Sequence, residues 1–75
     1  MNTTTLDTTG LICPLPLLRA KEAIKDVPTG ACLEVLATDP GTTSDFETFC
    51  EITGHTMLKQ SEADGVLRFL IKKCD

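Results

Sequence analysis

The sequence predicts a small α/β domain of two layers, with the element order β-α-β-α-β-β. Three observations carry this prediction: apolar residues at helical spacing over 14–27, alternation over 31–37, and an Asp-Gly turn between two strand-like segments. A chain of 75 residues buries only about 60% of the surface that its unfolded form exposes. We therefore expect a single domain over residues 1–75, with one small core between the layers.

A first strand and a first helix are expected in the N-terminal part of the chain. Residues Thr4–Thr8 are mostly β-branched and precede a Thr9-Gly10 turn, which is typical of a short strand. A helix over Pro14–Val27 follows, and Pro28-Thr29-Gly30 ends it. Its apolar stripe repeats at i, i+3, i+7 and i+10 and consists of Leu17, Ala20, Ile24 and Val27.

The C-terminal part repeats the strand-helix order and then adds a hairpin. Ala31–Ala37 alternates like a strand, and Asp39-Pro40-Gly41 breaks the chain after it. Thr42 and Asp45 have the spacing of a capping box, which predicts a helix up to Thr53 with Gly54 as its C-terminal cap. The last two strands are expected over 55–61 and 66–72, joined by the turn 62–65.

The connections determine the expected direction of each strand. Strands joined through a crossover helix run parallel, and the hairpin makes the last strand antiparallel. That strand, 66–72, is the most apolar, so a central place in the sheet is expected. Ligand and catalytic groups of open α/β sheets gather beyond the carboxyl ends of the parallel strands. Cys13, the loop 38–43 and the hairpin turn 62–65 should meet there.

The segment Gly10-Leu11-Ile12-Cys13-Pro14-Leu15-Pro16 places a cysteine where the first strand meets the first helix. Pro14 and Pro16 fit the first helical turn, whose N–H groups have no intrahelical partner. Cys13 then falls at or beside the N-cap, where the helix dipole and the unpaired N–H groups lower the pKa of a thiol. The sequence therefore predicts a nucleophilic cysteine at neutral pH.

Neighbouring charges leave two points open. The carboxylates Asp39, Glu62 and Asp64 lie on the loops expected around Cys13, where they either raise the thiol pKa or act only as solvated turn residues. The basic side chains of the first helix, Arg19, Lys21 and Lys25, either form a docking patch for acidic partners or pair with Glu22 and Asp26 on a solvated face.

The other cysteines and the histidine are expected to be structural. The spacing of Cys32, Cys50 and Cys74 resembles neither a disulfide framework nor a zinc site. Cys50 should pack in the core and Cys32 should be partly exposed on the open sheet face, while Cys74 is expected to be mobile. His55 follows Gly54 and is expected to cap the second helix at its C-terminus.

Composition excludes several classes of partner. The net charge of −4 and the isoelectric point of about 4.7 argue against direct binding of nucleic acid. No stretch has the apolar length that spans a bilayer, and the N-terminus lacks the parts of a signal peptide, so a cytoplasmic location without membrane contact is expected. The open sheet face, with Leu36, Val66 and Leu70 among charges, is a second candidate partner surface if its apolar residues are continuous.

The pattern of Leu6-Asp7, Gly10-Leu11, Cys13-Pro14-x-Pro16, Lys21, Asp39-Pro40 and Asp45 resembles the TusA/SirA family of small sulfur carriers. This resemblance implies a two-layer α/β (α+β) sandwich with a four-stranded mixed sheet, order 1-2-4-3, and both helices on one face. It also implies that Cys13 carries a persulfide received from a cysteine desulfurase or rhodanese and passed to an acceptor protein. The family serves tRNA thiolation, molybdenum cofactor assembly or sulfur oxidation.

The expected site therefore has Cys13 as the nucleophile, with Pro14, Pro16, Gly10, Lys21, Asp39 and Arg19 in supporting roles. No cofactor or metal is expected, because the sulfur is carried covalently and the partner proteins supply the remaining chemistry. Two other functions stay open. One is a non-catalytic interaction or regulatory module with a structural Cys13, and the other is a thiol redox protein, which would need a resolving cysteine near Cys13.

Overall fold

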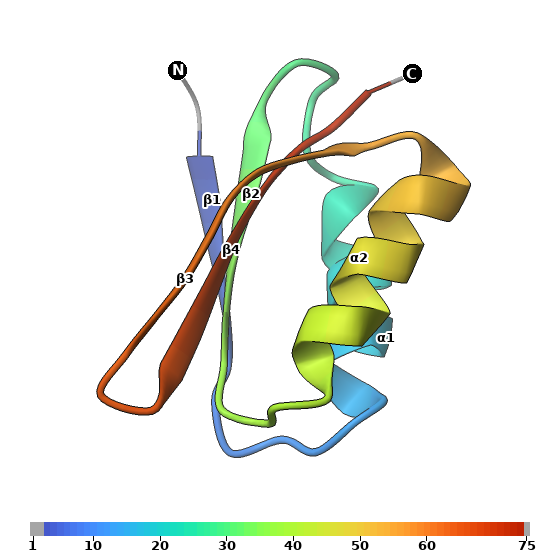
Figure 1. Cartoon of the computed structure of the whole chain (residues 1–75). Helices are drawn as coiled ribbons and strands as arrows, with labels where there is room; N and C mark the ends of the chain where they lie inside the picture. Colours follow the sequence, from blue (N-terminus) through green and yellow to red (C-terminus); the bar gives the residue numbers. More distant parts are fainter. Residues whose placement is uncertain (1–2, 75) are drawn as a thin grey trace.

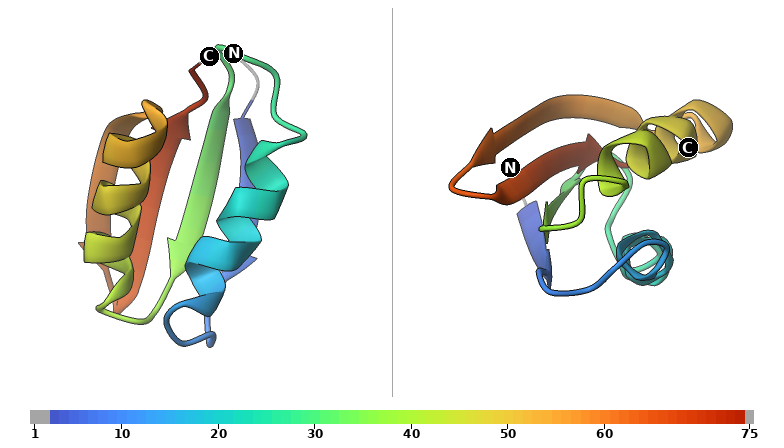
Figure 2. Two further views of the ribbon diagram at one scale, coloured as in Figure 1. Left: turned by 90° about the vertical axis from the view of Figure 1, so that its right-hand side faces the viewer. Right: turned by 60° about the horizontal axis from the view of Figure 1, so that its bottom comes forward.

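The four-stranded sheet has the order β1-β2-β4-β3 and both helices on one face (Figures 1 and 2). The computed structural model describes residues 3–74; Met1, Asn2 and Asp75, at the ends of the expected domain, lie outside the described residues. Strand β2 runs parallel to β1, and β4 runs antiparallel to both β2 and β3, as predicted. The elements are β1 (Thr3–Thr8), α1 (Leu15–Ile24), β2 (Cys32–Ala37), α2 (Thr42–Thr53), β3 (Thr56–Ala63) and β4 (Val66–Lys72).

Two elements end two or more residues away from the predicted position. Helix α1 ends at Ile24. The residues after it form turns in which the N–H groups of Asp26 and Val27 donate to carbonyls three residues earlier, each over 3.1 Å. Val27 is nonetheless buried, so the last member of the predicted stripe reaches the core from a turn. Strand β3 extends to Ala63, which leaves Asp64-Gly65 as a two-residue turn with φ values of 53° and 79°. Positive φ at both positions is what a type I′ hairpin turn requires.

The core lies between the sheet and the two helices. Phe46 is fully buried at its centre, with its ring centroid 5.0 Å from that of Phe69 and 6.3 Å from that of Phe49. The predicted stripe of the first helix faces this core, and α2 contributes Phe46, Phe49 and Cys50 to it. The buried cluster consists of Ala20, Ile24, Val27, Ala31, Leu33, Val35, Ala37, Phe46, Phe49, Cys50, Phe69 and Ile71.

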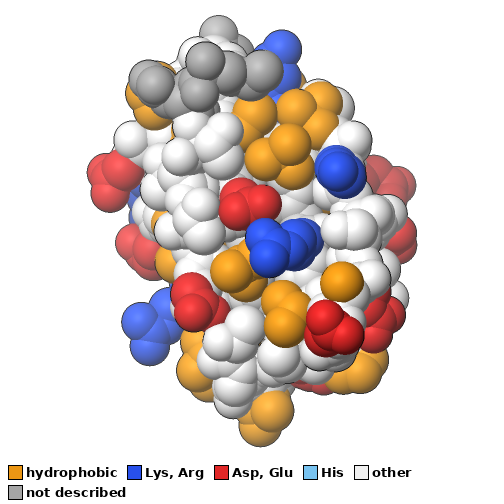
Figure 3. Space-filling model, turned by 90° about the vertical axis from the view of Figure 1, so that its left-hand side faces the viewer, with side chains coloured by type: hydrophobic (Ala, Val, Ile, Leu, Met, Phe, Trp, Pro, Cys, Tyr) orange, Lys and Arg blue, Asp and Glu red, His pale blue; other side chains and the backbone are white. Residues whose placement is uncertain are grey.

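The open face of the sheet is mixed in character. Figure 3 shows hydrophobic side chains separated by charged ones across the middle of this face, so it does not present one continuous apolar surface there. Glu34 and Arg68 form an ion pair of 3.6 Å on it. Cys32 is only 1% exposed, and its predicted partial exposure is wrong. Strand β2 is an inner strand, and Thr3 and Lys72 flank Cys32 from both sides.

Helix α2 begins without the predicted capping box. Its N-cap is Gly41, and Asp39 accepts hydrogen bonds from the N–H of Gly41 (3.3 Å, to Oδ1) and of Thr42 (3.0 Å, to the backbone carbonyl). Thr42 is therefore the first helical residue rather than the cap, and its side chain turns inward. The C-terminal cap is Gly54 as predicted, with φ of 84° and its N–H bonded to the carbonyl of Cys50 over 2.9 Å.

Replacing Thr42 with valine is expected to stabilise the protein by about 1 kcal/mol. The Thr42 side chain is buried, and its hydroxyl has no hydrogen-bond partner within residues 3–74. Valine has nearly the same shape and removes the cost of desolvating that hydroxyl. Urea unfolding measures the change, with the exposed Thr48→Val on the same helix as control. A loss of stability in Thr42→Val would contradict this account.

Candidate functional site

The loops after β1 and β2 meet at one end of the sheet, as predicted (Figure 1). The first loop carries Cys13, and the second carries Asp39 and leads into α2. The β3–β4 hairpin turn lies at the same end of the sheet. Its carboxylates Glu62 and Asp64 are not among the groups that shift the pKa of Cys13. Of the two other loops expected around the thiol, only the one after β2 acts on its pKa, through Asp39, and the second charge is Asp45 in α2.

The loop that leads to Cys13 is tied to β2 by side-chain hydrogen bonds. Thr8 Oγ1 donates to the carbonyl of Leu36 (2.5 Å), and the Gly10 N–H donates to Thr38 Oγ1 (2.9 Å). Asp7 Oδ1 accepts hydrogen bonds from the N–H and the hydroxyl of Thr9. Gly10 has φ of 84°, a conformation that favours glycine. A glycine at this position therefore gives the chain its turn toward the cysteine.

Cys13 is exposed and is held at two points by carboxylates. Its N–H donates to Asp39 Oδ2 over 2.5 Å, and its thiol donates to Asp45 Oδ2 over 2.6 Å. The Cys13–Pro14 peptide bond is cis. Gly41 is also close, since a Cβ built there would lie 3.8 Å from the Cβ of Cys13. The backbone and the sulfur of Cys13 are thus both oriented by the start of α2 and the loop before it.

The predicted lowering of the Cys13 pKa is wrong. Helix α1 begins at Leu15 with Pro14 as its N-cap, so Cys13 lies one residue before the cap; Pro16, in the first turn as predicted, is buried. The hydrogen bond to Asp45 raises the pKa of the Cys13 thiol, and desolvation and the charges of Asp45 and Asp39 act in the same direction. The open question about neighbouring carboxylates is therefore answered by Asp39 and Asp45, which oppose ionisation.

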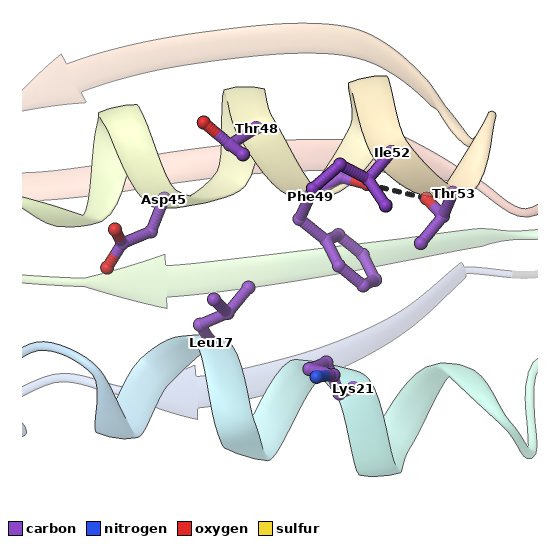
Figure 4. Close-up of a pocket in the computed structure, with 7 residues that line it drawn as sticks. All are labelled: Leu17, Lys21, Asp45, Thr48, Phe49, Ile52 and Thr53. Carbon is purple, nitrogen blue, oxygen red and sulfur yellow. Dashed lines mark hydrogen bonds between the residues drawn. The ribbon is translucent and has the colours of Figure 1, made fainter.

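The basic residues of α1 have different surroundings. Lys21 lines a groove of about 250 Å³ between the two helices, which Figure 4 shows with Asp45 toward one end. Lys25 pairs with Glu22 over 3.4 Å, and both side chains are mostly exposed, as in a solvated helix face. Arg19 is exposed. The other residues that line the groove are Leu17, Thr48, Phe49, Ile52 and Thr53.

The remaining cysteines and His55 lie away from Cys13. Cys50 is buried in the core as predicted, and burial raises the pKa of its thiol. His55 Nδ1 accepts a hydrogen bond from the Cys74 N–H (3.0 Å), and its ring contacts Phe49. Its predicted capping of the second helix is wrong, because within residues 3–74 its ring bonds to Cys74 and not to a carbonyl of α2. The Thr56 hydroxyl also lies 3.4 Å from the Cys74 sulfur, and the expected mobility of Cys74 stays a prediction.

Asp45 is the site residue whose contact the sequence reasoning missed. The Thr42-x-x-Asp45 spacing assigned it to a cap, although its place just beyond the carboxyl end of β2 is the signal that could have put it beside Cys13.

Residues 3–74 contain no group of three or more Cys, His, Asp or Glu side chains placed to hold a metal ion. No helix in the same range is both long and apolar enough to cross a membrane.

The fold and the site define a small two-layer α/β protein that exposes one of its cysteines where the first strand leads into the first helix. The family model described as sulfurtransferase TusA matches residues 4–73. The chain belongs to this family, which confirms the predicted resemblance.

Similar proteins come from several bacteria. A protein of Neisseria meningitidis serogroup A is 54% identical over 72 residues, covering 96% of this chain and 97% of the relative. The sulfur carrier protein TusA of Allochromatium vinosum is 47% identical over 68 residues, covering 91% of this chain and 90% of the relative. The crystal structure of a SirA-like protein from Desulfitobacterium hafniense has a TM-score of 0.83 at 26% identity, covering 96% and 99% of the two chains. The fold predicted from the resemblance is thereby confirmed.

Proposed function

We propose that this protein carries sulfur as a persulfide on Cys13, which accepts it from a donor protein and passes it to an acceptor. The observation that carries this proposal is the exposed Cys13 thiol, whose backbone and sulfur are both held by side chains from the neighbouring loop and helix. Membership in the sulfurtransferase TusA family supports it. We favour a cysteine desulfurase or a rhodanese as the donor. We also propose that the transfer takes place in the cytoplasm.

Exposed apolar side chains around Cys13 support a protein as the partner. Ile12 is 71% exposed, Leu18 48% and Leu15 40%, and all three lie within a few residues of the thiol. Apolar side chains grouped on a surface are typical of places where another protein docks. The donor, and later the acceptor, would bury these three side chains when its own sulfur reaches the sulfur of Cys13.

The transfer needs no bound cofactor. The Cys13 thiol loses its proton, and the thiolate attacks the outer sulfur of the donor persulfide, so that a new S–S bond forms and the donor's S–S bond breaks. The donor leaves as a thiolate, and Cys13 now carries the outer sulfur. In the second step an acceptor thiolate attacks this outer sulfur, and Cys13 leaves as a thiolate. Each step exchanges one S–S bond for another without net oxidation.

We assign supporting roles to the residues around Cys13. Gly10, Pro14 and Pro16 set the path of the backbone, and Asp39 holds the Cys13 N–H. Lys21 and Arg19 are basic side chains of α1 available for docking. The partner protein that binds this surface would decide the pathway that the sulfur enters: tRNA thiolation, molybdenum cofactor assembly or sulfur oxidation.

Mass spectrometry after incubation with a persulfidated cysteine desulfurase or rhodanese tests the proposal. The wild type is expected to gain the mass of one sulfur atom, and a reducing agent should remove this added sulfur. Cys13→Ser is expected to gain none. Cys74→Ser is the matched control, because Cys74 is the next most accessible cysteine, and it should load like the wild type. Equal loading of Cys13→Ser would overturn the assignment. No loading of the wild type by either donor would favour the interaction module with a structural Cys13.

A further inference from the structure

Asp45 faces the sulfur of Cys13 from a different element of the fold. It lies in the first turn of α2 and is half-buried. It accepts a hydrogen bond from the thiol of Cys13, which lies 32 positions earlier in the chain. Asp39 is already engaged, since its two carboxylate oxygens accept the N–H groups of Cys13 and Gly41. Within residues 3–74 no Lys, Arg or His side chain lies within ion-pair distance of Asp45.

We propose that Asp45 is a positioning residue that keeps Cys13 protonated in the free protein, and that an Arg or Lys of the partner protein pairs with Asp45 and releases the thiol. This inference rests on the proposed role of Cys13 as sulfur carrier and adds the chemistry of the partner's contact point. The free carrier would be slow toward stray electrophiles, and the docked carrier would be reactive.

The strengths of the two contacts favour this exchange. A thiol is a weak hydrogen-bond donor, whereas an ionised carboxylate has about four acceptor positions and forms its strongest contacts with Arg and Lys. When a cation pairs with Asp45, the Asp45 carboxylate no longer accepts the hydrogen bond from the Cys13 thiol. The cation also compensates the negative charge of Asp45. A cation next to a cysteine also favours the thiolate directly. The proton then leaves to solvent, and the thiolate attacks the donor persulfide.

The charged groups around Cys13 limit where this cation can come from. Asp45 of α2 and Asp39 of the preceding loop are the charges that act on the thiol. From α1, Lys21 lines the same groove as Asp45, and Figure 4 shows it farther along the groove. A partner cation that entered through the groove would meet this like charge. It therefore has to approach Asp45 from the side of Cys13, where the sulfur is transferred.

Alkylation with iodoacetamide tests the first half of the proposal in the free protein. The rate at Cys13 is followed by mass analysis of the peptide that contains it, over a range of pH. In Asp45→Asn, which keeps the side-chain shape, and in Asp45→Ala, the rate at neutral pH should rise about fivefold, and its rise with pH should move to lower pH. Glu51→Gln, an exposed carboxylate on the same helix, is the control and should match the wild type. Unchanged profiles in both Asp45 variants would overturn the inference.

Two charged thiol reagents of similar size test the preference for a cation. Aminoethyl and sulfonatoethyl methanethiosulfonate both react with the thiolate, so the ratio of their rates reports the local charge and not the thiol pKa. The wild type should favour the cationic reagent, and Asp45→Asn should lower the ratio about threefold at low salt. An equal ratio in wild type and Asp45→Asn would overturn the cationic contact.

Sulfur loading from the persulfidated donor protein separates this role from a structural one. Asp45→Asn should react faster with iodoacetamide but load more slowly from the protein donor, because the partner cation has lost its counter-charge. A role of Asp45 without any effect on the charge at Cys13 would slow neither or both reactions. If the wild type takes up no sulfur while the Asp45 effects on alkylation appear, the carrier function fails. If loading is normal and those effects are absent, this inference alone fails.

Discussion

Phe46→Ala is expected to remove a large share of the protein's folding free energy, about 3–5 kcal/mol. Phe46 is fully buried and stacks on Phe69 of β4 at an interplanar angle of 30°, while Phe49 meets it edge-on. Its loss opens a cavity between the helix and the sheet layers, and such a cavity adds to the lost burial of the ring. A domain of 75 residues has a total stability of roughly 4–11 kcal/mol. The variant should therefore be partly unfolded at moderate temperature.

Thermal and urea unfolding followed by circular dichroism measure this effect. Ile52→Ala is the matched control, because Ile52 lies on the same helix but is 79% exposed. Its stability should stay within about 0.5 kcal/mol of the wild type. Equal losses in the two variants would show that α2 does not pack on the sheet through Phe46.

Asp39→Ala is expected to have opposite effects on two reactions of Cys13. Asp39 fastens the Cys13 N–H and the start of α2, so its loss should loosen the cysteine and lower the rate of sulfur transfer from a protein donor about tenfold. The same substitution removes a charge that raises the pKa of the Cys13 thiol, so the reaction with iodoacetamide at neutral pH should become faster.

Parallel rate measurements of persulfide loading and of alkylation check this expectation. Asp26→Ala removes an exposed carboxylate beyond the end of α1 and serves as the control, with both rates unchanged. If Asp39→Ala slowed both reactions together, general disorder of the loop would explain the result better than loss of the specific hydrogen bonds. If it changed neither, Asp39 would have no part in positioning Cys13.

The element order could be predicted because its signals are local. The Leu17, Ala20 and Ile24 spacing and the Asp64-Gly65 turn each report on the few residues around them, and the structure has both features where they were expected. The boundaries were less predictable. Strand β3 runs to Ala63, because pairing with β4 extends to the Asp-Gly turn, and that pairing is not visible in β3 alone.

The site was predictable in position but not in electrostatics. The strand-helix junction and the parallel direction expected of β1 and β2 are enough to place Cys13 and Asp39 at one end of the sheet, and the structure has them there. The state of the thiol depended on two further facts. The chain enters α1 at Leu15, one residue later than expected, and α2 is capped at Gly41 rather than at Thr42.

The sequence by itself determined the order of the elements, the family and the place of Cys13 at the junction of the first strand and helix, since these follow from periodicity and from the motif residues between Leu6 and Asp45. Only the tertiary structure decided that the cysteine is held as a thiol. That outcome depends on a carboxylate 32 residues away, whose direction is set by how α2 packs and where it begins. Hydrogen bonds between distant segments act on a pKa at close range, and no local pattern reports which side chains will meet.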